Sequence, residues 1–211
     1  APDTSGTTLA AVSRSPWQVR YVGGVPQGNA VAVARDGAVF VSDRTANAAG
    51  DGALTRILPD GAVSHVITGE TAEGIAIDER RGIVYVGNVN DGTVLAVDAR
   101  TMQPLRRFRA VPRAYGLTLD PDGTTLYAVA NQSATSPFAA PGYVAAIDVA
   151  SAHPHVVRRS RSLRFPVAAA LDVADGLLFV SDESADVVYV LRASTLRDAH
   201  APLRTCDVPW E

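Results

Sequence analysis

The residues of this chain that could do chemistry are acids, amides, arginines and a tyrosine placed at the ends of apolar runs. Carboxylate and amide oxygens are the ligands that a hard cation prefers, so a ring of them could hold Ca²⁺ or another divalent metal. The same residue types also cap turns and stand solvated in loops, and both interpretations stay open at this stage. Ten residues are expected at one ligand-binding mouth: Asn29, Asp43, Arg44, Glu73, Asn88, Asn90, Arg113, Tyr115, Asn131 and Asp182.

No sequence signature of a known catalytic centre accompanies these residues. The chain has no Gly-x-Ser-x-Gly nucleophile elbow, no phosphate loop and no His-Glu-x-x-His zinc helix. His153 and His155 could grip a transition metal, but they are expected in a surface turn without a nearby carboxylate cluster. The single cysteine, Cys206, allows no internal disulfide. The sequence therefore identifies no catalytic residue and leaves enzymatic activity open.

Arginine supplies every one of the 19 basic residues. Two dense groups fall 52 residues apart, so adjacent repeat units would bring them together on the outer rim: Arg106, Arg107, Arg109, Arg158, Arg159 and Arg161. Such a rim could meet phosphates or an acidic partner through guanidinium contacts. Alternatively, it protects outer strands from pairing with other sheets. A net charge of −3 argues against a generally cationic nucleic-acid binder.

The elements that must position these residues belong to a repeat. Tyr85 and Tyr127 lie 42 residues apart, and the stretches 73–88 and 115–130 are closely similar around them. Self-similarity at about 40 to 45 residues, with short strands in each unit, is typical of a β-propeller. We therefore expect an all-β fold made of four-stranded antiparallel blades, with strands A to D running from the inside outwards.

Turn and core residues recur at fixed places in each unit. Asp-Gly pairs such as Asp122-Gly123 follow the A strand and suit a tight hairpin. Each B strand then carries an aromatic residue that we expect to fill the wedge between neighbouring blades: Phe40, Tyr85, Tyr127 and Phe179. A strands begin and B strands end on the same face, so the D–A and B–C connections should frame one mouth there. Two long B–C connections, 43–52 and 131–142, lean towards function.

The strand count does not close a ring. Residues 1–27 supply only C and D strands, and 28–70, 71–111, 112–164 and 165–208 supply full blades, which gives about four and a half. Propellers normally close their rings. The chain is expected to be part of a larger propeller of five to seven blades, a small ring with an imperfect blade, or one half of an assembly in which a second chain supplies strands.

The units resemble the YVTN-repeat β-propellers of bacteria and archaea. Tyr85-Val86-Gly87-Asn88 keeps three of the four letters of the motif, and 92–131 follows the whole unit, whereas Tyr127-Ala128-Val129-Ala130 departs from it. The resemblance implies a propeller, often exported, and no single activity. Glu73 and Asp182 also resemble the metal-binding Glu and Asp of gluconolactonase-like propellers, although Tyr115-Gly116 stands where that family has Asn-Gly.

Three functions remain open. The first is a non-catalytic scaffold that binds a small ligand or protein partner at the mouth. The second is a metal-dependent lactonase or related hydrolase that uses Glu73 and Asp182, and the third is partner or nucleic-acid binding through the arginine rim. No apolar run reaches the ~18 to 20 residues of a membrane helix. The chain begins with Ala1, which fits signal-peptide removal and a secreted or periplasmic location, or an arbitrary start.

Overall fold

The computed structural model describes residues 9–14, 17–22, 27–131 and 141–204. Within these residues the chain forms eighteen strands and no helix, so the expected all-β fold is confirmed. The described part accordingly holds no helix with the length and apolar character needed to cross a bilayer.

Sixteen strands form four antiparallel sheets of four, and the first two pair separately. We call the sheets blades 1 to 4 and the pair the half-blade. The half-blade contains β1 (Leu9–Arg14) and β2 (Trp17–Val22). Blade 1 contains β3 (Gly28–Val33), β4 (Val39–Asp43), β5 (Asp51–Ile57) and β6 (Val63–Glu70). Blade 2 contains β7 (Ala72–Asp78), β8 (Ile83–Asn88), β9 (Thr93–Asp98) and β10 (Pro104–Arg109). Blade 3 contains β11 (Ala114–Leu119), β12 (Thr125–Ala130), β13 (Tyr143–Asp148) and β14 (His155–Arg159). Blade 4 contains β15 (Pro166–Asp172), β16 (Leu177–Asp182), β17 (Val187–Arg192) and β18 (Leu203–Arg204).

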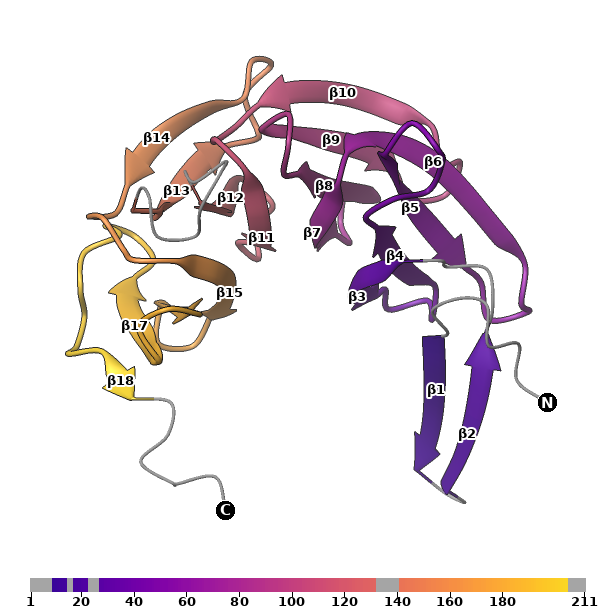
Figure 1. Cartoon of the computed structure of the whole chain (residues 1–211), viewed down its shortest axis with the longest axis horizontal. Helices are drawn as coiled ribbons and strands as arrows, with labels where there is room; N and C mark the ends of the chain where they lie inside the picture. The colour runs from indigo at the N-terminus through magenta and orange to yellow at the C-terminus, as the bar shows by residue number, and fades with distance from the viewer. Residues whose placement is uncertain (1–8, 15–16, 23–26, 132–140, 205–211) are drawn as a thin grey trace.

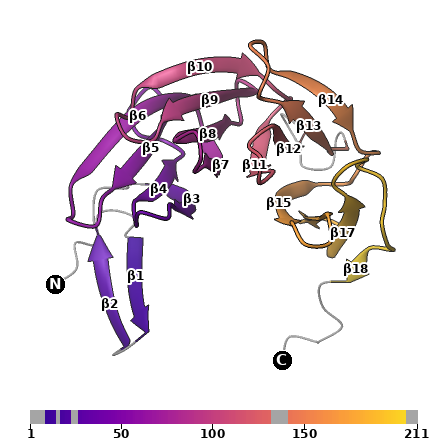
Figure 2. The same ribbon diagram turned by 180° about the vertical axis from the view of Figure 1, so that it is seen from behind.

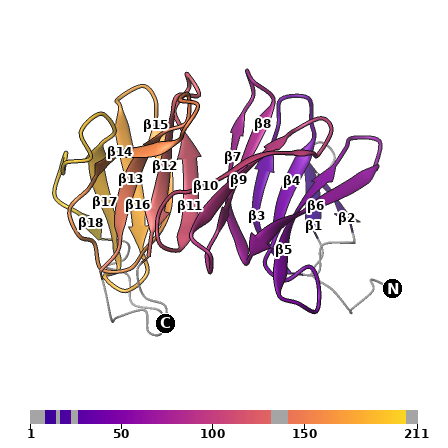
Figure 3. The ribbon, with the colours of Figure 1, turned by 90° about the horizontal axis from the view of Figure 1, so that it is seen from above.

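The blades stand side by side in an open arc (Figure 1). The first strand of each blade, β3, β7, β11 or β15, lies on the inner side of the arc, and the fourth lies outermost. The view from behind shows the same gap between the half-blade and blade 4 (Figure 2). Seen from above, the strands of all four blades run between the same two faces (Figure 3). This is the arrangement of a partial β-propeller, as the repeat predicts.

The inner strands approach one another so closely that two positions require glycine. A Cβ on Gly74 of β7 would lie 2.2 Å from the carbonyl oxygen of Tyr115 in β11. A Cβ on Gly116 of β11 would lie 2.8 Å from the Cα of Ala168 in β15. Because the obstructing atoms belong to backbone, a side chain at either position would push two blades apart. The glycine that recurs at positions 74 and 116, 42 residues apart, is therefore a packing requirement of the inner strands.

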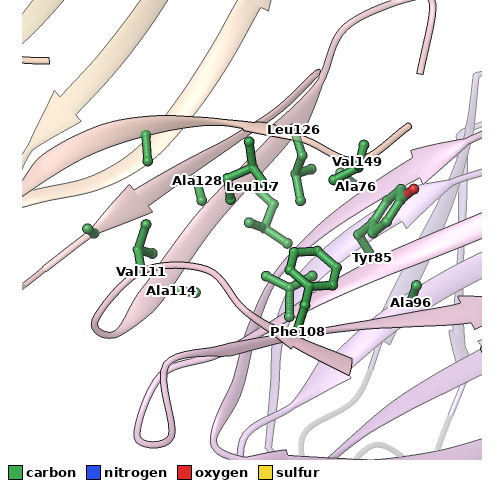
Figure 4. Close-up of a cluster of buried hydrophobic side chains, with 14 of the residues drawn as sticks. Ala76, Tyr85, Ala96, Phe108, Val111, Ala114, Leu117, Leu126, Ala128 and Val149 are labelled. Atoms are coloured by element: carbon green, nitrogen blue, oxygen red, sulfur yellow. The ribbon is translucent and has the colours of Figure 1, made fainter. Parts of the chain in front are cut away.

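The repeated aromatic residue fills the space between blades, as expected. Phe40 packs in the cluster shared by blades 1 and 2, and Tyr127 in the one shared by blades 3 and 4. Tyr85 packs against residues of blade 3 such as Leu126 (Figure 4). Phe179 of blade 4 is only half-buried. The difference arises because no described strand follows blade 4.

The inner strand of blade 1 is uncovered on the side that faces away from blade 2. Val31 and Val33 of β3 are 52% and 65% exposed. Their counterparts in β7, Ile75 and Ile77, pack against the core shared with blade 1. In the described residues β1 pairs only with β2, so the half-blade has no inner strands to cover this surface.

The outermost strand of blade 3 is shorter than the sequence pattern predicts. The run of Val and Arg residues there predicts a D strand over 156–163, but the strand ends at Arg159, and Leu163 makes only an isolated bridge to Gly142. The fourth strand of blade 4 is predicted at 202–208; Leu203–Arg204 is its described part, because residues from 205 onwards lie outside the described residues.

Candidate functional site

Each inner strand carries a β-bulge near its first residue. The pairing with the second strand shifts between Gly28 and Val31, between Ala72 and Ile75, between Ala114 and Leu117, and between Pro166 and Ala168. A bulge bends a strand and re-aims a side chain, and it often lies beside a binding site. Three of the ten expected mouth residues, Asn29, Glu73 and Tyr115, stand at this repeated position.

The D–A and B–C connections meet on one face, as expected from strand direction. In each blade the residue after the second strand donates its backbone N–H to the residue before the first strand. Val89 donates to Thr71 at 3.0 Å, and Asn131 donates to Arg113 at 3.3 Å. Thr71 and Arg113 have positive φ values of 60° and 52°, which is unusual for side chains of this size. These strained junctions fix the connections at the mouth.

Glu73 is the centre of a polar cluster that joins blades 1 and 2. Its side chain is 8% exposed, and its Oε1 atom forms an ion pair with Arg44 Nε at 2.9 Å. Asn29 Nδ2 of blade 1 donates to the other carboxylate oxygen of Glu73. The backbone is tied as well, because Ser42 Oγ donates to the Glu73 carbonyl oxygen at 2.5 Å. The Glu73 carboxylate is thereby held in one orientation by Arg44 of the β4–β5 connection and by Asn29 of the inner strand of blade 1.

Burial raises the pKa of Glu73, and the nearby charge of Arg44, the hydrogen bond from Asn29 and the charge of Arg113 each oppose that rise. The carboxyl group therefore holds its proton more tightly than an exposed glutamate. Carboxyl groups with a shifted pKa gather at functional sites, although structural ion pairs shift the pKa too. Arg113 belongs to the junction of blades 2 and 3, and its charge is close enough to Glu73 to lower the pKa of that carboxyl group.

Arg113, Tyr115 and Phe165 form the adjoining part of the mouth. The Arg113 guanidinium lies 5.7 Å from the centre of the Tyr115 ring, and its Nη2 donates to the Tyr115 hydroxyl at 3.2 Å. The Tyr115 and Phe165 rings meet edge to face with centroids 6.4 Å apart. Stacking of this kind orients a guanidinium while leaving its other donors available.

A pocket of about 390 Å³ opens beside Arg113. It lies between the β8–β9 connection and the β10–β11 connection, and residues 90–92 and 109–113 line it. Asn90 and Arg113 were expected here from the sequence, whereas Asp91, Val111 and Pro112 were not. Asn90 is held by a hydrogen bond from its Nδ2 to Thr71 Oγ1 at 2.9 Å. Val111 and Pro112 lie where one repeat unit joins the next, and only that position could have indicated from the sequence that they line a pocket.

The expected residues at the ends of the second strands are buried and take part in the fold. Asp43, Asn88, Asn131 and Asp182 are between 0% and 4% exposed. Asn88 Nδ2 donates to Thr93 Oγ1 at 3.2 Å. The Asp43 carboxylate accepts the N–H of Thr45 at 3.2 Å. The bonds of Asp43 and Asn88 hold the connections that follow these strands in shape.

Asp182 is a turn cap. One oxygen accepts the N–H of Phe165 at 2.8 Å, and the other accepts the N–H groups of Ser184 and Ala185 at 3.1 and 2.9 Å. It belongs to blade 4 and Glu73 to blade 2, with blade 3 between them. The part of the chain that the structure describes contains no group of three His, Cys, Asp or Glu side chains that could hold a metal. A metal held by Glu73 and Asp182 stays a prediction, and the geometry adds no support for it.

The arginines expected on the rim divide by their partners. Arg106 donates to the carbonyl oxygens of Ser151 and Val149 in blade 3, at 2.9 and 2.5 Å. Arg107 donates to Thr93 Oγ1 at 3.1 Å and pairs with Asp91 at 3.5 Å. Arg109 lines the mouth pocket. The other three, Arg158, Arg159 and Arg161, line a separate pocket between blades 3 and 4.

The comparisons with known proteins establish the fold and no more. No protein-family model and no curated protein matches the sequence. Hydrazine synthase of Kuenenia stuttgartiensis is similar in structure, with a TM-score of 0.69, 16% identity and coverage of 86% of this chain and 51% of that chain. A chain of a nidogen–laminin complex gives a TM-score of 0.69 with 14% identity, over 92% of this chain and 73% of that one. A protein of unknown function from Desulfotomaculum acetoxidans gives a TM-score of 0.70 with 14% identity, over 88% and 58%. The YVTN-repeat family is not confirmed by these likenesses, and the chain spans little more than half of two of the three structures.

Proposed function

We propose that this chain is a non-catalytic binding scaffold that presents the mouth of the arc to a small polar ligand or a protein partner. One observation carries the proposal. The charged cluster around Glu73 adjoins an open pocket and the stacked Arg113 and Tyr115, and the strands and connections of three consecutive blades supply these groups.

The chemistry of the mouth favours a ligand with an anionic or carbonyl group. Arg109 and Arg113 line the pocket, and Asp91 is its acid, already engaged at one oxygen by Arg107. Tyr115 and Phe165 offer an aromatic edge on which an apolar part of a ligand could rest. A pocket of a few hundred Å³ with few, fixed polar groups is the usual form of a small-molecule site.

The Glu73 cluster acts as the fixed side of this site. Its carboxylate is paired at both oxygens, so it offers no free base for catalysis. Its charge instead helps to hold Arg44 and Arg113 in place, because opposite charges in a partly desolvated site attract strongly. A pre-ordered site loses less entropy when a ligand binds.

The uncovered side of blade 1, which faces away from blade 2, suits a second kind of partner. Val31 and Val33 expose the surface that Ile75 and Ile77 bury in the next blade. We propose that strands of a second chain cover it. The two sites are separable, because this surface lies on the side of blade 1 away from blade 2.

The mouth proposal is tested by thermal-shift screening of a library of small carboxylic acids, amides and sugars. Ligands that raise the melting temperature of the unaltered protein should lose that effect with Arg113→Gln. Arg35→Gln, an exposed arginine at the turn between β3 and β4, is the matched control and should keep it. Equal responses of the two variants would refute the proposed site.

A further inference from the structure

A second pocket lies on the outer rim between blades 3 and 4, away from the mouth. It has a volume of about 570 Å³ and is lined by residues 158–161, at the end of β14, and 195–198, between β17 and β18. Figure 1 shows β14 beside the chain that leads to β18. Four of the eight lining residues are arginines: Arg158, Arg159, Arg161 and Arg197.

One of these four charges is neutralised within the fold. Arg161 Nε donates to both oxygens of Asp198, at 2.8 and 3.1 Å. Asp198 is the acid of the pocket lining. The Arg159 guanidinium carbon lies 5.0 Å from the centre of the Tyr143 ring. This contact fixes the position of the guanidinium but does not neutralise its positive charge. Among the described residues, Arg158 and Arg197 make no side-chain hydrogen bond or ion pair, so three positive charges face the pocket uncompensated.

The repeat explains why Arg158 is free. At each earlier blade junction, an arginine donates to a carbonyl oxygen at the end of the third strand of the next blade. Arg56 donates to Ala99 at 2.9 Å between blades 1 and 2. Arg106 donates to Val149 at 2.5 Å between blades 2 and 3. These bonds tie neighbouring blades together.

At the junction of blades 3 and 4 a different side chain takes that carbonyl oxygen. The equivalent acceptor is Ala193, and the Tyr127 hydroxyl donates to it at 3.2 Å. Arg158 is the counterpart of Arg106, because each lies opposite an alanine of the third strand that in turn faces the repeated tyrosine. With its acceptor occupied by Tyr127, the Arg158 guanidinium lines the open pocket instead.

We propose that this rim pocket binds the phosphate group of a small phosphorylated molecule. Guanidinium groups match the geometry of phosphate oxygens and form strong charge-assisted bonds to them. Three like charges in one pocket repel each other until an anion compensates them. The volume suits a small molecule better than a bare ion. This site does not depend on the proposed role of the mouth.

The test is calorimetric titration with inorganic phosphate and with phenyl phosphate, at an ionic strength held constant with chloride. The pocket variant is Arg158→Gln with Arg197→Gln. The control is Arg35→Gln with Arg204→Gln, which removes two exposed arginines and the same charge elsewhere. We expect the pocket variant to weaken phosphate binding at least about tenfold, and the control to change it less than about twofold.

The outcomes decide the proposal. Phenyl phosphate should bind at least as tightly as inorganic phosphate, because the pocket has room for the ester group. Equal weakening in both variants, or no saturable binding to the unaltered protein, would show that only diffuse charge attracts phosphate and would overturn the site. A phosphoserine peptide that binds more tightly than phenyl phosphate would overturn its assignment to a small molecule.

Discussion

Arg106 and Arg158 occupy the same position of the repeat, and the structure gives them opposite roles. We predict that Arg106→Met destabilises the protein and that Arg158→Met does not. Methionine keeps an apolar stem of similar reach, so each change removes chiefly the charged, hydrogen-bonding head. In Arg106 that head joins blade 2 to two carbonyl oxygens of blade 3 and lies 5.8 Å from the Phe108 ring centre.

The magnitude follows from those contacts. A hydrogen bond from a charged group contributes about 1.5 to 3 kcal/mol net, and Arg106 makes two to part-buried carbonyl groups. Its partial exposure lowers the sum, so we expect a loss of about 2 to 4 kcal/mol in the free energy of unfolding. Arg158 has no such bond, and an exposed substitution of this kind should change stability by less than about 0.5 kcal/mol.

Urea denaturation followed by circular dichroism measures the difference. With an m-value of about 3 kcal/mol/M, the midpoint should fall by about 0.7 to 1.3 M for Arg106→Met and stay in place for Arg158→Met. Equal losses for the two variants would refute the claim that arginine-to-carbonyl bonds tie the blades together. A change in m-value would instead show that the unfolding units have changed.

Three further changes test other parts of the structure. The pKa of Glu73 is raised above its ordinary value of 4.5 in the folded state. Between 4.5 and the raised pKa the folded state therefore binds more protons than the unfolded state, so the free energy of unfolding falls as the pH rises through this interval. Glu73→Gln should flatten this part of a stability-against-pH curve measured by urea denaturation; an unchanged slope would contradict the assignment. Gly74→Ala should cost about 1 to 3 kcal/mol or more in the same assay, because the new Cβ meets backbone of the neighbouring inner strand; a neutral result would mean that the inner strands can separate. Val31→Asp with Val33→Asp should reduce association measured by light scattering, whereas Val63→Asp, an equally exposed valine of an outer strand, should not; matching effects would remove the proposed second chain from this surface.

The fold could be predicted from the sequence because the repeat is a local signal. The aromatic residue of the second strand and the glycine pair 74 and 116 each have one structural role, and it is the same in every interior blade. The end blades could not be read this way. Phe179 carries the same letter as Phe40, and its exposure depends on which strands follow it, which the pattern within one blade does not contain.

The site was predictable in part for the same reason. Asn29, Glu73 and Tyr115 share one position of the repeat, so their common place at a bulge was within reach of sequence reasoning. Whether a carboxylate there is free or paired depends on side chains from another blade. Asp182 illustrates the point, because backbone N–H groups on either side of it donate to both of its oxygens. Arg106 donates to the carbonyl oxygen of Val149, whereas Tyr127 donates to the equivalent carbonyl oxygen of Ala193 and Arg158 does not. No sequence pattern records that difference.

A crystallographic fragment screen with a library of small carboxylic acids, amides and sugars would show whether the mouth is the binding face. We predict that bound fragments gather in the pocket lined by residues 90–92 and 109–113, with polar groups on Arg113 and apolar parts towards Tyr115. Fragments found only elsewhere, with this pocket empty in crystals that leave it open, would contradict the claim that the mouth is the binding face.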